Sequence, residues 1–206
     1  MSQRLADPIA ASVEKDVLEP LKSYFKDRPF YYDPFKRRDD VGRSFERYVR
    51  GNISRMVSKV SDSDGYSVSR LVPDFFISDD YMNYMSVKNG SVFGAIGNRV
   101  VEIMGEGNFI IYDRSMRNLT EIDDFLRYKK NDMEADGVPI IFEATVSKNH
   151  SGVSASRKSG LISNMMGAEA MYVGIEMGNT PHTRILSHGR REKKMVVGSV
   201  PQDWAR

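Results

Sequence analysis

The sequence predicts an α/β fold behind an N-terminal helical region. Apolar residues recur at helical spacing through most of the first sixty positions, whereas short apolar runs rich in β-branched and aromatic residues dominate the remainder. With 206 residues, of which 40% are hydrophobic, the chain is long enough for one solid core, alone or with a smaller appended element. We expect an N-terminal helical region at 1–65, a connection at 66–89 and an α/β domain at 90–206.

Two helices are predicted in the N-terminal region. The first covers 8–19, because its apolar residues share one face, Asp7 is a suitable N-cap and Pro8 fits the first helical position. Pro20 then kinks the helix or restarts it. The second helix covers 40–60 and is amphipathic, with apolar residues on one face and basic residues on the other.

The basic face of the second helix has two open interpretations. Between residues 36 and 59 there are eight Lys or Arg and three Asp or Glu, and eight minus three gives a local charge of +5. The face is either a solvated surface with intrahelical pairs, such as Arg43 or Arg50 with Glu46, or a phosphate-binding surface that includes Arg47. Turn-forming residues at 61–65 then end the helical region.

The α/β region is expected to alternate between helices and short strands. Gly105-Glu106-Gly107 stops the first helix of this region, and Asp136-Gly137 marks a turn before a strand. The expected elements in order are a helix at 91–104, strands at 109–112, 120–128 and 139–146, a helix at 154–166, and strands at 171–175 and 195–200.

Composition excludes several functional classes. The chain has no Cys, so it has no disulfide, thiolate nucleophile or Cys-based zinc site, and its three His have no metal-ligand spacing. No stretch approaches the roughly 18 apolar residues that span a bilayer, so we expect no membrane partner and a cytoplasmic location. The net charge is only +2, so nucleic-acid binding would depend on local basic clusters, of which a second one surrounds Arg190 and Arg191.

Two of the predicted strands carry carboxylates inside apolar sequence. Because alternate side chains of a strand share a face, Glu121 and Asp123 lie together, as do Glu143 and Thr145. If the two strands are neighbours, Asp123 and Glu143 point to the same edge and can hold a divalent cation, which prefers oxygen ligands. The alternative is that the first acids face solvent and Glu143 forms an ion pair with a Lys or Arg.

This arrangement resembles the PD-(D/E)XK nuclease superfamily over roughly residues 90–176. The resemblance implies a restriction-endonuclease-like core of helix, three-stranded antiparallel meander, helix and strand. In that family an Asp begins the second strand and an acidic residue lies in the third, and these positions match Asp123 and Glu143. A Lys follows the acid by two residues in the family, where this chain has Thr145.

The resemblance also implies Mg²⁺ or Mn²⁺ as cofactor, bound by Asp123, Glu143 and the carbonyl of Ala144, with Glu121 as a further candidate ligand. The catalytic set would comprise Asp123, Glu143, Thr145 and Lys148. The charge of the absent Lys would come from Lys148, or from Arg157 and Lys158 on the following helix.

The predicted function is metal-dependent hydrolysis of DNA phosphodiester bonds. The alternative is a module that retains the nuclease fold without catalysis and binds nucleic acid or serves in protein assembly. DNA is the expected partner, and the resemblance implies a homodimer. The residues expected to contact DNA are Arg43, Arg47, Arg50, Arg157, Lys158, Arg190 and Arg191.

Overall fold

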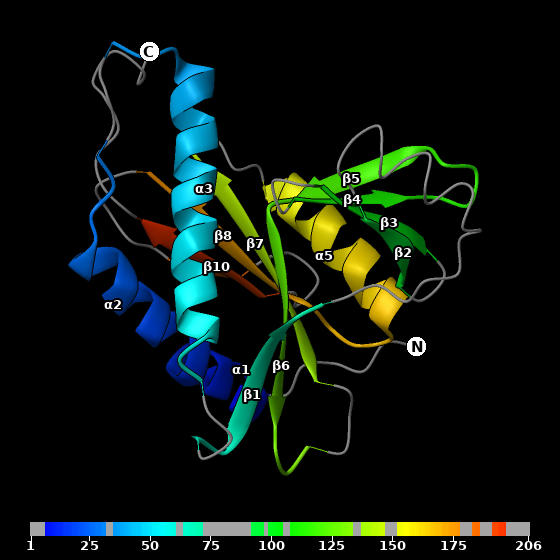
Figure 1. Ribbon diagram of the computed structural model, residues 1–206. Coiled ribbons are helices and arrows are strands. Elements are labelled where there is room, and N and C mark those ends of the chain that lie inside the picture. The colour runs from blue at the N-terminus through cyan, green and yellow to red at the C-terminus, as the bar shows by residue number, and fades with distance from the viewer. Residues whose placement is uncertain are drawn as a thin grey trace.

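The protein has a mixed α/β architecture with two sheets and a group of N-terminal helices (Figure 1). The structure is a computed structural model. It describes residues 7–31, 35–60, 64–71, 92–96, 99–104, 108–133, 137–146, 152–177, 183–185 and 191–196, with backbone only for 7, 92, 152–156 and the last two ranges.

The helices are α1 (Asp7–Val13), the π-helical segment η1 (Glu14–Leu18), α2 (Glu19–Asp27), α3 (Arg38–Val57) and α5 (Gly152–Met166). The strands are β1 (Tyr66–Arg70), β2 (Val92–Ile96), β3 (Arg99–Ile103), β4 (Phe109–Tyr112), β5 (Asn118–Ile122), β6 (Asp124–Lys130), β7 (Val138–Thr145), β8 (Met171–Glu176), β9 (Thr183–Ile185) and β10 (Arg191–Val196).

The larger sheet has six strands in the order β1-β6-β7-β8-β10-β9. Strands β1, β6 and β7 are antiparallel neighbours, whereas β7, β8 and β10 are parallel and β9 is antiparallel to β10. Helix α5 connects β7 to β8, as a crossover between parallel strands requires. The smaller sheet is the antiparallel meander β2-β3-β4-β5.

The N-terminal helices change character just before Pro20. Proline has no N–H to donate to the carbonyl of Asp16, four residues earlier, and the hydroxyl of Tyr66 donates to that oxygen instead, over 3.2 Å. The N–H of Glu19 bonds to the carbonyl of Glu14, which is a π-helical spacing. The predicted restart of the helix at Pro20 is therefore confirmed, with a π-helical turn as the transition.

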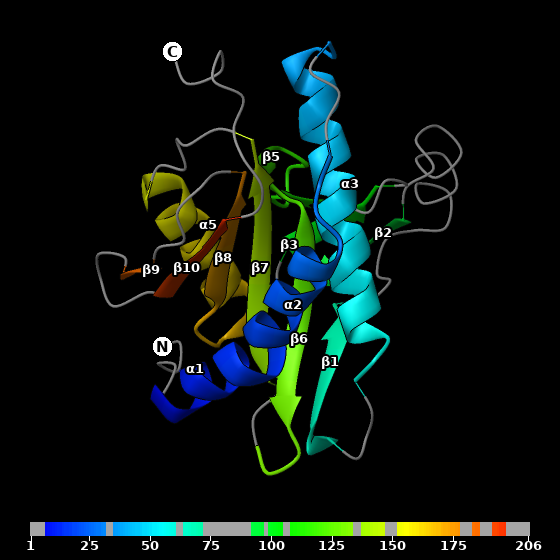
Figure 2. The ribbon, with the colours of Figure 1, turned by 90° about the vertical axis from the view of Figure 1, so that its left-hand side faces the viewer.

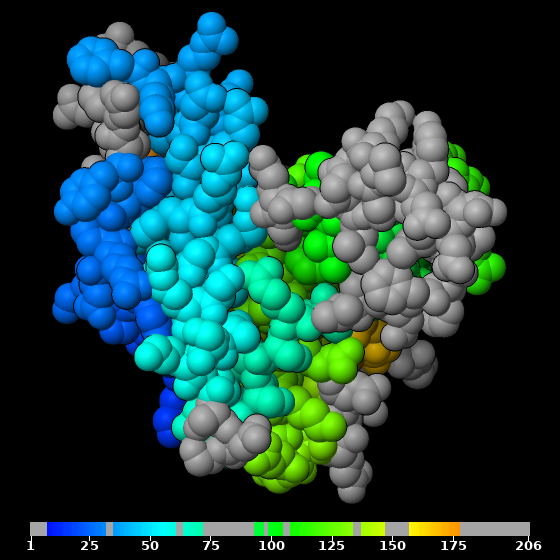
Figure 3. Space-filling model, viewed as in Figure 1, coloured from blue at the N-terminus to red at the C-terminus, as the bar shows by residue number. Residues whose placement is uncertain are grey.

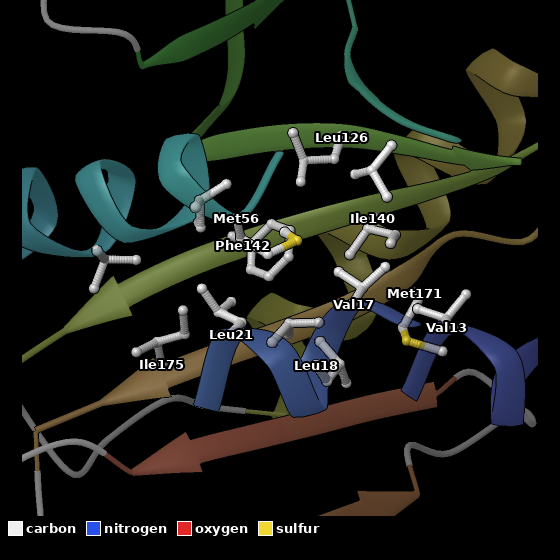
Figure 4. Close-up of a cluster of buried hydrophobic side chains, with 14 of the residues drawn as sticks. Val13, Val17, Leu18, Leu21, Met56, Leu126, Ile140, Phe142, Met171 and Ile175 are labelled. Carbon is white, nitrogen blue, oxygen red and sulfur yellow. The ribbon is translucent and has the colours of Figure 1, made fainter. Parts of the chain in front are cut away.

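Two apolar clusters occupy opposite faces of the larger sheet. Helices α1, α2 and α3 cover one face, and α5 and the smaller sheet lie on the other side (Figures 1 and 2). Along β7 the side chains alternate, since Ile140 and Phe142 join the cluster under the N-terminal helices while Ile141 joins the cluster beneath α5. Figure 4 shows Leu18 and Leu21 of the helical region among the side chains of the first cluster.

Most predicted elements are present, although their assignment to sheets differs. The helix at 40–60 corresponds to α3 and the helix at 154–166 to α5, while the strands at 109–112, 139–146 and 171–175 correspond to β4, β7 and β8. The final strand begins earlier than expected, since β10 covers 191–196, and residues 197–200 lie outside the described part of the chain.

The helix predicted at 91–104 is wrong, because this segment forms the antiparallel strands β2 and β3. Apolar residues there fit both a helical and an alternating pattern, but Val92, Ile96, Val100, Val101 and Ile103 are β-branched and favour strands. A Gly-Asn pair between the two runs is also a typical hairpin sequence. Tertiary pairing with β4 decides the outcome in favour of strands.

The strand predicted at 120–128 is divided at Asp123 into β5 and β6, which belong to different sheets. The antiparallel trio of the larger sheet is consequently β1, β6 and β7 rather than three strands consecutive in sequence. Residues 71–123, which include the smaller sheet, separate β1 from β6.

The boundary predicted at residue 65 stays a prediction. A single buried cluster contains Val17 and Phe45 from the helical region together with Leu126 and Phe142 from the larger sheet, so the two regions share a core. Within the described ranges, no helix has the length and apolar character needed to cross a membrane.

Candidate functional site

Asp123 lies between the two sheets, as the single residue that links β5 to β6. Its Oδ2 accepts a hydrogen bond from the backbone N–H of Ala144 over 2.6 Å. This bond holds the carboxylate next to the end of the pairing between β6 and β7. Only 8% of Asp123 is exposed. The link between the sheets thus places an acidic side chain against the end of β7.

Glu143 lies next to Asp123. The register of β6 and β7 ends with Asp124 opposite Phe142. The hydrogen bond from Ala144 to Asp123, and the effect of the Asp123 charge on the Glu143 pKa, show that the two acids are close together. Side-chain alternation directs the Glu143 carboxylate to the α5 side, since Ile141, two residues before it, packs in the cluster beneath α5. The structure thus brings together the two acids that the sequence singled out.

Lys158 of α5 contacts this pair. Its Nζ donates to Oε1 of Glu143 over 2.5 Å, and the side chains of Lys158 and Glu143 are only 16% and 9% exposed. The helix that follows β7 therefore supplies an ammonium group to the acid in β7. Thr145, at the position of the family's Lys, is half-buried and contributes a hydroxyl rather than a charge.

The environment opposes ionisation of both acids. Burial, followed by the neighbouring Asp123 carboxylate, raises the pKa of Glu143 from 4.5 to about 8, while Lys158 acts in the opposite direction. Burial also raises the pKa of Asp123, against the Ala144 hydrogen bond and the charges of Lys158 and Arg50. Two adjacent carboxylates with raised pKa values are typical of a functional site, and a bound cation would relieve their repulsion.

Asp124 has a different environment from its neighbour. Both of its carboxylate oxygens accept hydrogen bonds from Arg70 of β1, each over 3.0 Å, and Arg70 also donates to Oγ of Ser54 in α3. The side chain is fully buried, and burial raises its pKa to about 6 despite the Arg70 guanidinium. Asp124 thus forms an ion pair that joins β6 to β1 and α3.

Glu121 is at the periphery of the site. It is exposed, and its Oε1 accepts a hydrogen bond from Nδ2 of Asn108 over 2.7 Å. Its charge contributes to the raised pKa values of Asp123 and Glu143, so it lies near them. Asn108 in turn accepts a hydrogen bond from Nη1 of Arg50.

Glu176 is an acidic residue that the sequence pattern did not single out. It is the last residue of β8, only 5% exposed, and its backbone pairs with that of Thr145. Alternation in β8 puts it on the same side as Tyr172, which packs beneath α5. The predicted strand ended one residue earlier, so extending it to Glu176 would have placed this side chain on the face of Glu143.

The predicted basic surface of α3 is divided between two environments. Arg43 and Arg47 are exposed and line an open depression of about 470 Å³ together with Lys36, Asp40 and Ser44. Arg43 also forms an ion pair with Asp40 over 2.7 Å. Arg50, by contrast, is buried, so the prediction of a single exposed basic face is wrong at this position.

The space-filling view shows the surface hollowed between α3 and the lobe that contains the smaller sheet (Figure 3). The hydrogen bond from Arg50 to Asn108 connects α3 with the residue preceding β4.

Of the other basic candidates, Arg157 is exposed on α5. Lys148 and Arg190 lie outside the described residues, as does the side chain of Arg191.

Among the residues that the structure describes, no group of three or more His, Cys, Asp or Glu side chains is arranged to hold a metal ion. A divalent cation at this site would thus depend on two carboxylates and main-chain oxygen. The sequence matches no family model, and no curated protein matches it significantly. The geometry of the site is therefore the basis for a functional assignment.

Proposed function

We propose that this protein hydrolyses phosphodiester bonds of DNA with a divalent cation, Mg²⁺ or Mn²⁺, held by Asp123 and Glu143. The observation that carries the proposal is the contact of three groups at one point of the fold. Ala144 N–H bonds to Asp123, Glu143 is the adjacent residue in β7, and Lys158 Nζ lies 2.5 Å from Glu143. Two carboxylates and an ammonium group are the groups that the nuclease resemblance requires.

The order of elements around the site supports the restriction-endonuclease-like interpretation. Helix α3, the antiparallel strands β1, β6 and β7, helix α5 and the parallel strand β8 follow the order of helix, three antiparallel strands, helix and strand. Asp123 immediately precedes the second of these strands, and Glu143 lies in the third. The β2–β5 sheet is then an insertion between the first and second strands of the core.

The donor set fits a hard divalent cation. Carboxylate oxygens are preferred ligands of Mg²⁺, and this cation is commonly bound through only one or two protein carboxylates while water completes its shell. The raised pKa of Glu143, about 8, reflects in part its repulsion by Asp123. A cation between the two acids would remove this repulsion, which is why their proximity favours binding.

The carbonyl of Ala144 is a suitable third donor. In an extended strand the N–H and C=O of one residue point toward the same neighbouring strand, and the N–H of Ala144 points to Asp123. Its carbonyl is consequently directed to the same side as Asp123. This agrees with the ligand set implied by the resemblance.

When bound, the cation would lower the pKa of a water molecule and polarise the phosphate. The residues of this chain have separate roles around it. Asp123, oriented by the Ala144 N–H, provides a fixed carboxylate, and Glu143 provides the second. Lys158 would hold the attacking water and stabilise negative charge on the phosphate, so that α5 replaces the Lys absent at Thr145.

Affinity for DNA would come from the exposed residues of α3 and the segment before it. Arg43 and Arg47 line the depression on α3, and the aromatic side chains of Tyr31 and Phe35 are 84% and 96% exposed. Basic side chains neutralise phosphates, and exposed aromatic rings stack on unpaired bases. A homodimer would double this surface.

The second candidate is a module that retains the fold without catalysis. The observation that favours it is the direct Lys158–Glu143 ion pair, which neutralises one carboxylate without a metal ion. In that case the ion pair stabilises the contact between α5 and β7, and the basic residues of α3 bind nucleic acid or a protein partner.

A cleavage assay separates the two candidates. The wild type and the Asp123→Ala, Glu143→Ala and Lys158→Met variants are incubated with supercoiled, linear and branched DNA in Mg²⁺ or Mn²⁺. Glu19→Gln, which replaces an exposed glutamate of α2, serves as the matched control. Cleavage by the wild type and the control that is lost in the three variants supports the nuclease. Cleavage on none of the substrates, or equal cleavage by all proteins, contradicts it, and salt-dependent DNA retention without cleavage supports the binding module.

A further inference from the structure

Arg50 has an unusual environment for an arginine on the polar side of a helix. It is only 6% exposed, and Nη1 donates to Oδ1 of Asn108, which in turn donates through Nδ2 to Glu121. The side chain thus leaves α3 and reaches the edge of the smaller sheet. These contacts fix the direction of the guanidinium plane.

The second terminal nitrogen of this guanidinium, Nη2, is buried and has no hydrogen-bond partner among the residues the structure describes. A buried guanidinium donor without an acceptor is unfavourable, and a bound ion or water molecule is one of the explanations for such a group. A suitable acceptor must place an oxygen atom within hydrogen-bond distance of Nη2. It must also fit among the charged side chains around Arg50.

Two acidic residues affected by the charge of Arg50 accept hydrogen bonds from other groups. Both oxygens of Asp124 accept hydrogen bonds from Arg70, and Oδ2 of Asp123 accepts one from Ala144. Arg50 nevertheless lies near enough to lower the pKa of both acids through its charge. Among the described residues, the Arg50 guanidinium therefore acts on the Asp123 carboxylate through its charge and not through a hydrogen bond.

We propose that Nη2 of Arg50 forms an anion subsite that binds a non-bridging oxygen of a phosphate group beside Asp123. Guanidinium groups bind phosphate oxygens strongly, and the bond is strengthened in a site shielded from water. The assignment of this phosphate to the DNA backbone next to the scissile bond rests on the proposed function. The anion subsite itself depends only on the position of Arg50.

This role differs from that of Arg43 and Arg47. Those residues are exposed on α3 and would contribute to affinity along the strand. Arg50 is fixed by Asn108 and buried near the acidic pair, so it would position one phosphate relative to Asp123. It is a binding and positioning residue rather than part of the long-range basic surface.

Phosphate titration in a metal chelator tests the subsite without any requirement for catalysis. Inorganic phosphate is added to the wild type, Arg50→Met and Arg50→Lys, and the arginine side-chain N–H resonances are followed by NMR. Arg55→Met is the control, because it removes the same charge from an exposed position further along α3. Thermal unfolding of each variant shows whether it is folded.

We expect phosphate to shift the Arg50 resonances and Arg50→Met to weaken binding at least tenfold, with a smaller effect for Arg50→Lys and none for Arg55→Met. If Arg50→Met does not fold, Arg50→Lys decides the question, since loss of the forked donor geometry is expected to weaken binding several-fold. Equal phosphate affinity in the folded Arg50 variants and the wild type would overturn the proposal and leave Arg50 a structural residue.

The outcome is separable from that of the nuclease assay. Phosphate binding at Arg50 without DNA cleavage would retain the subsite and reject the nuclease. Metal-dependent cleavage with no response of Arg50 to phosphate, and an unchanged KM in Arg50→Lys, would retain the nuclease and reject the subsite.

Discussion

Replacement of Glu143 by Gln should change how the stability of the protein depends on pH. The pKa of Glu143 is raised from 4.5 to about 8 in the folded protein, mainly by burial. The folded state thus binds this proton more tightly than the unfolded chain. The resulting penalty on folding is absent below about pH 4.5, grows as pH rises, and is complete above about pH 8.

The magnitude follows from the pKa values. Between pH 6 and pH 8 the unfolded chain is ionised at this position throughout, while the folded protein passes from protonated to half-ionised. A proton held by the folded state alone over two pH units corresponds to a loss of about 2.7 kcal/mol of unfolding free energy. Half-ionisation of the folded state at pH 8 reduces this loss by about 0.4 kcal/mol, so about 2 kcal/mol remains. Gln does not titrate, so Glu143→Gln should not show this loss.

Urea unfolding in a chelator at pH 6 and pH 8 measures the difference. The wild type and Glu19→Gln should each lose about 2 kcal/mol more unfolding free energy across this range than Glu143→Gln does. An identical pH dependence in all three proteins would refute the account of Glu143 as a buried carboxylate repelled by Asp123.

Three further substitutions test individual parts of the structure. Lys158→Met removes the charge that opposes the rise in the Glu143 pKa, so ¹³C NMR should report a Glu143 pKa above its wild-type value. Asp124→Asn breaks the buried ion pair with Arg70 and should lower the unfolding free energy by about 2 kcal/mol in urea, while Mn²⁺ binding by the folded protein is unchanged. Gly137→Ala should cost about 2 kcal/mol or more in the same assay, because Gly137 has φ +94° and a Cβ there would lie 2.5 Å from a main-chain oxygen of β6.

Each of these has a distinct contradicting result. An unchanged or lower Glu143 pKa in Lys158→Met would mean that the two side chains do not form an ion pair in solution. Loss of Mn²⁺ binding in folded Asp124→Asn would place Asp124 in the metal site. Full stability of Gly137→Ala would contradict the backbone conformation before β7.

The sequence predicted the elements whose patterns are unambiguous. The helix at 40–60 has a long amphipathic repeat, and the strand at 139–146 is a continuous apolar run of the length of a buried strand. The segment at 91–104 fits two periodicities, and only pairing with β4 selects strands. Strand β1 was not recognised because its composition, Tyr-Ser-Val-Ser-Arg, is largely polar and its pairing with β6 spans a long insertion.

The candidate site was predictable in part. Strand alternation located Asp123 and Glu143 on one face, and the structure places them side by side with Lys158, which the sequence offered as one of several basic residues. The change of sheet at Asp123 and the burial of Arg50 were not predictable. Both result from contacts between the two sheets and α3, which leave no periodic pattern in the sequence.

Direct measurement of Mn²⁺ binding tests the central claim, that Asp123 and Glu143 together hold a divalent cation. Titration at pH 8, followed by calorimetry and by the EPR signal of free Mn²⁺, should detect a site in the wild type and in Glu19→Gln, and Asp123→Asn and Glu143→Gln should each abolish it. Binding of equal affinity in the Asp123 and Glu143 variants, or no binding by the wild type, would contradict the metal site and with it the proposed hydrolysis.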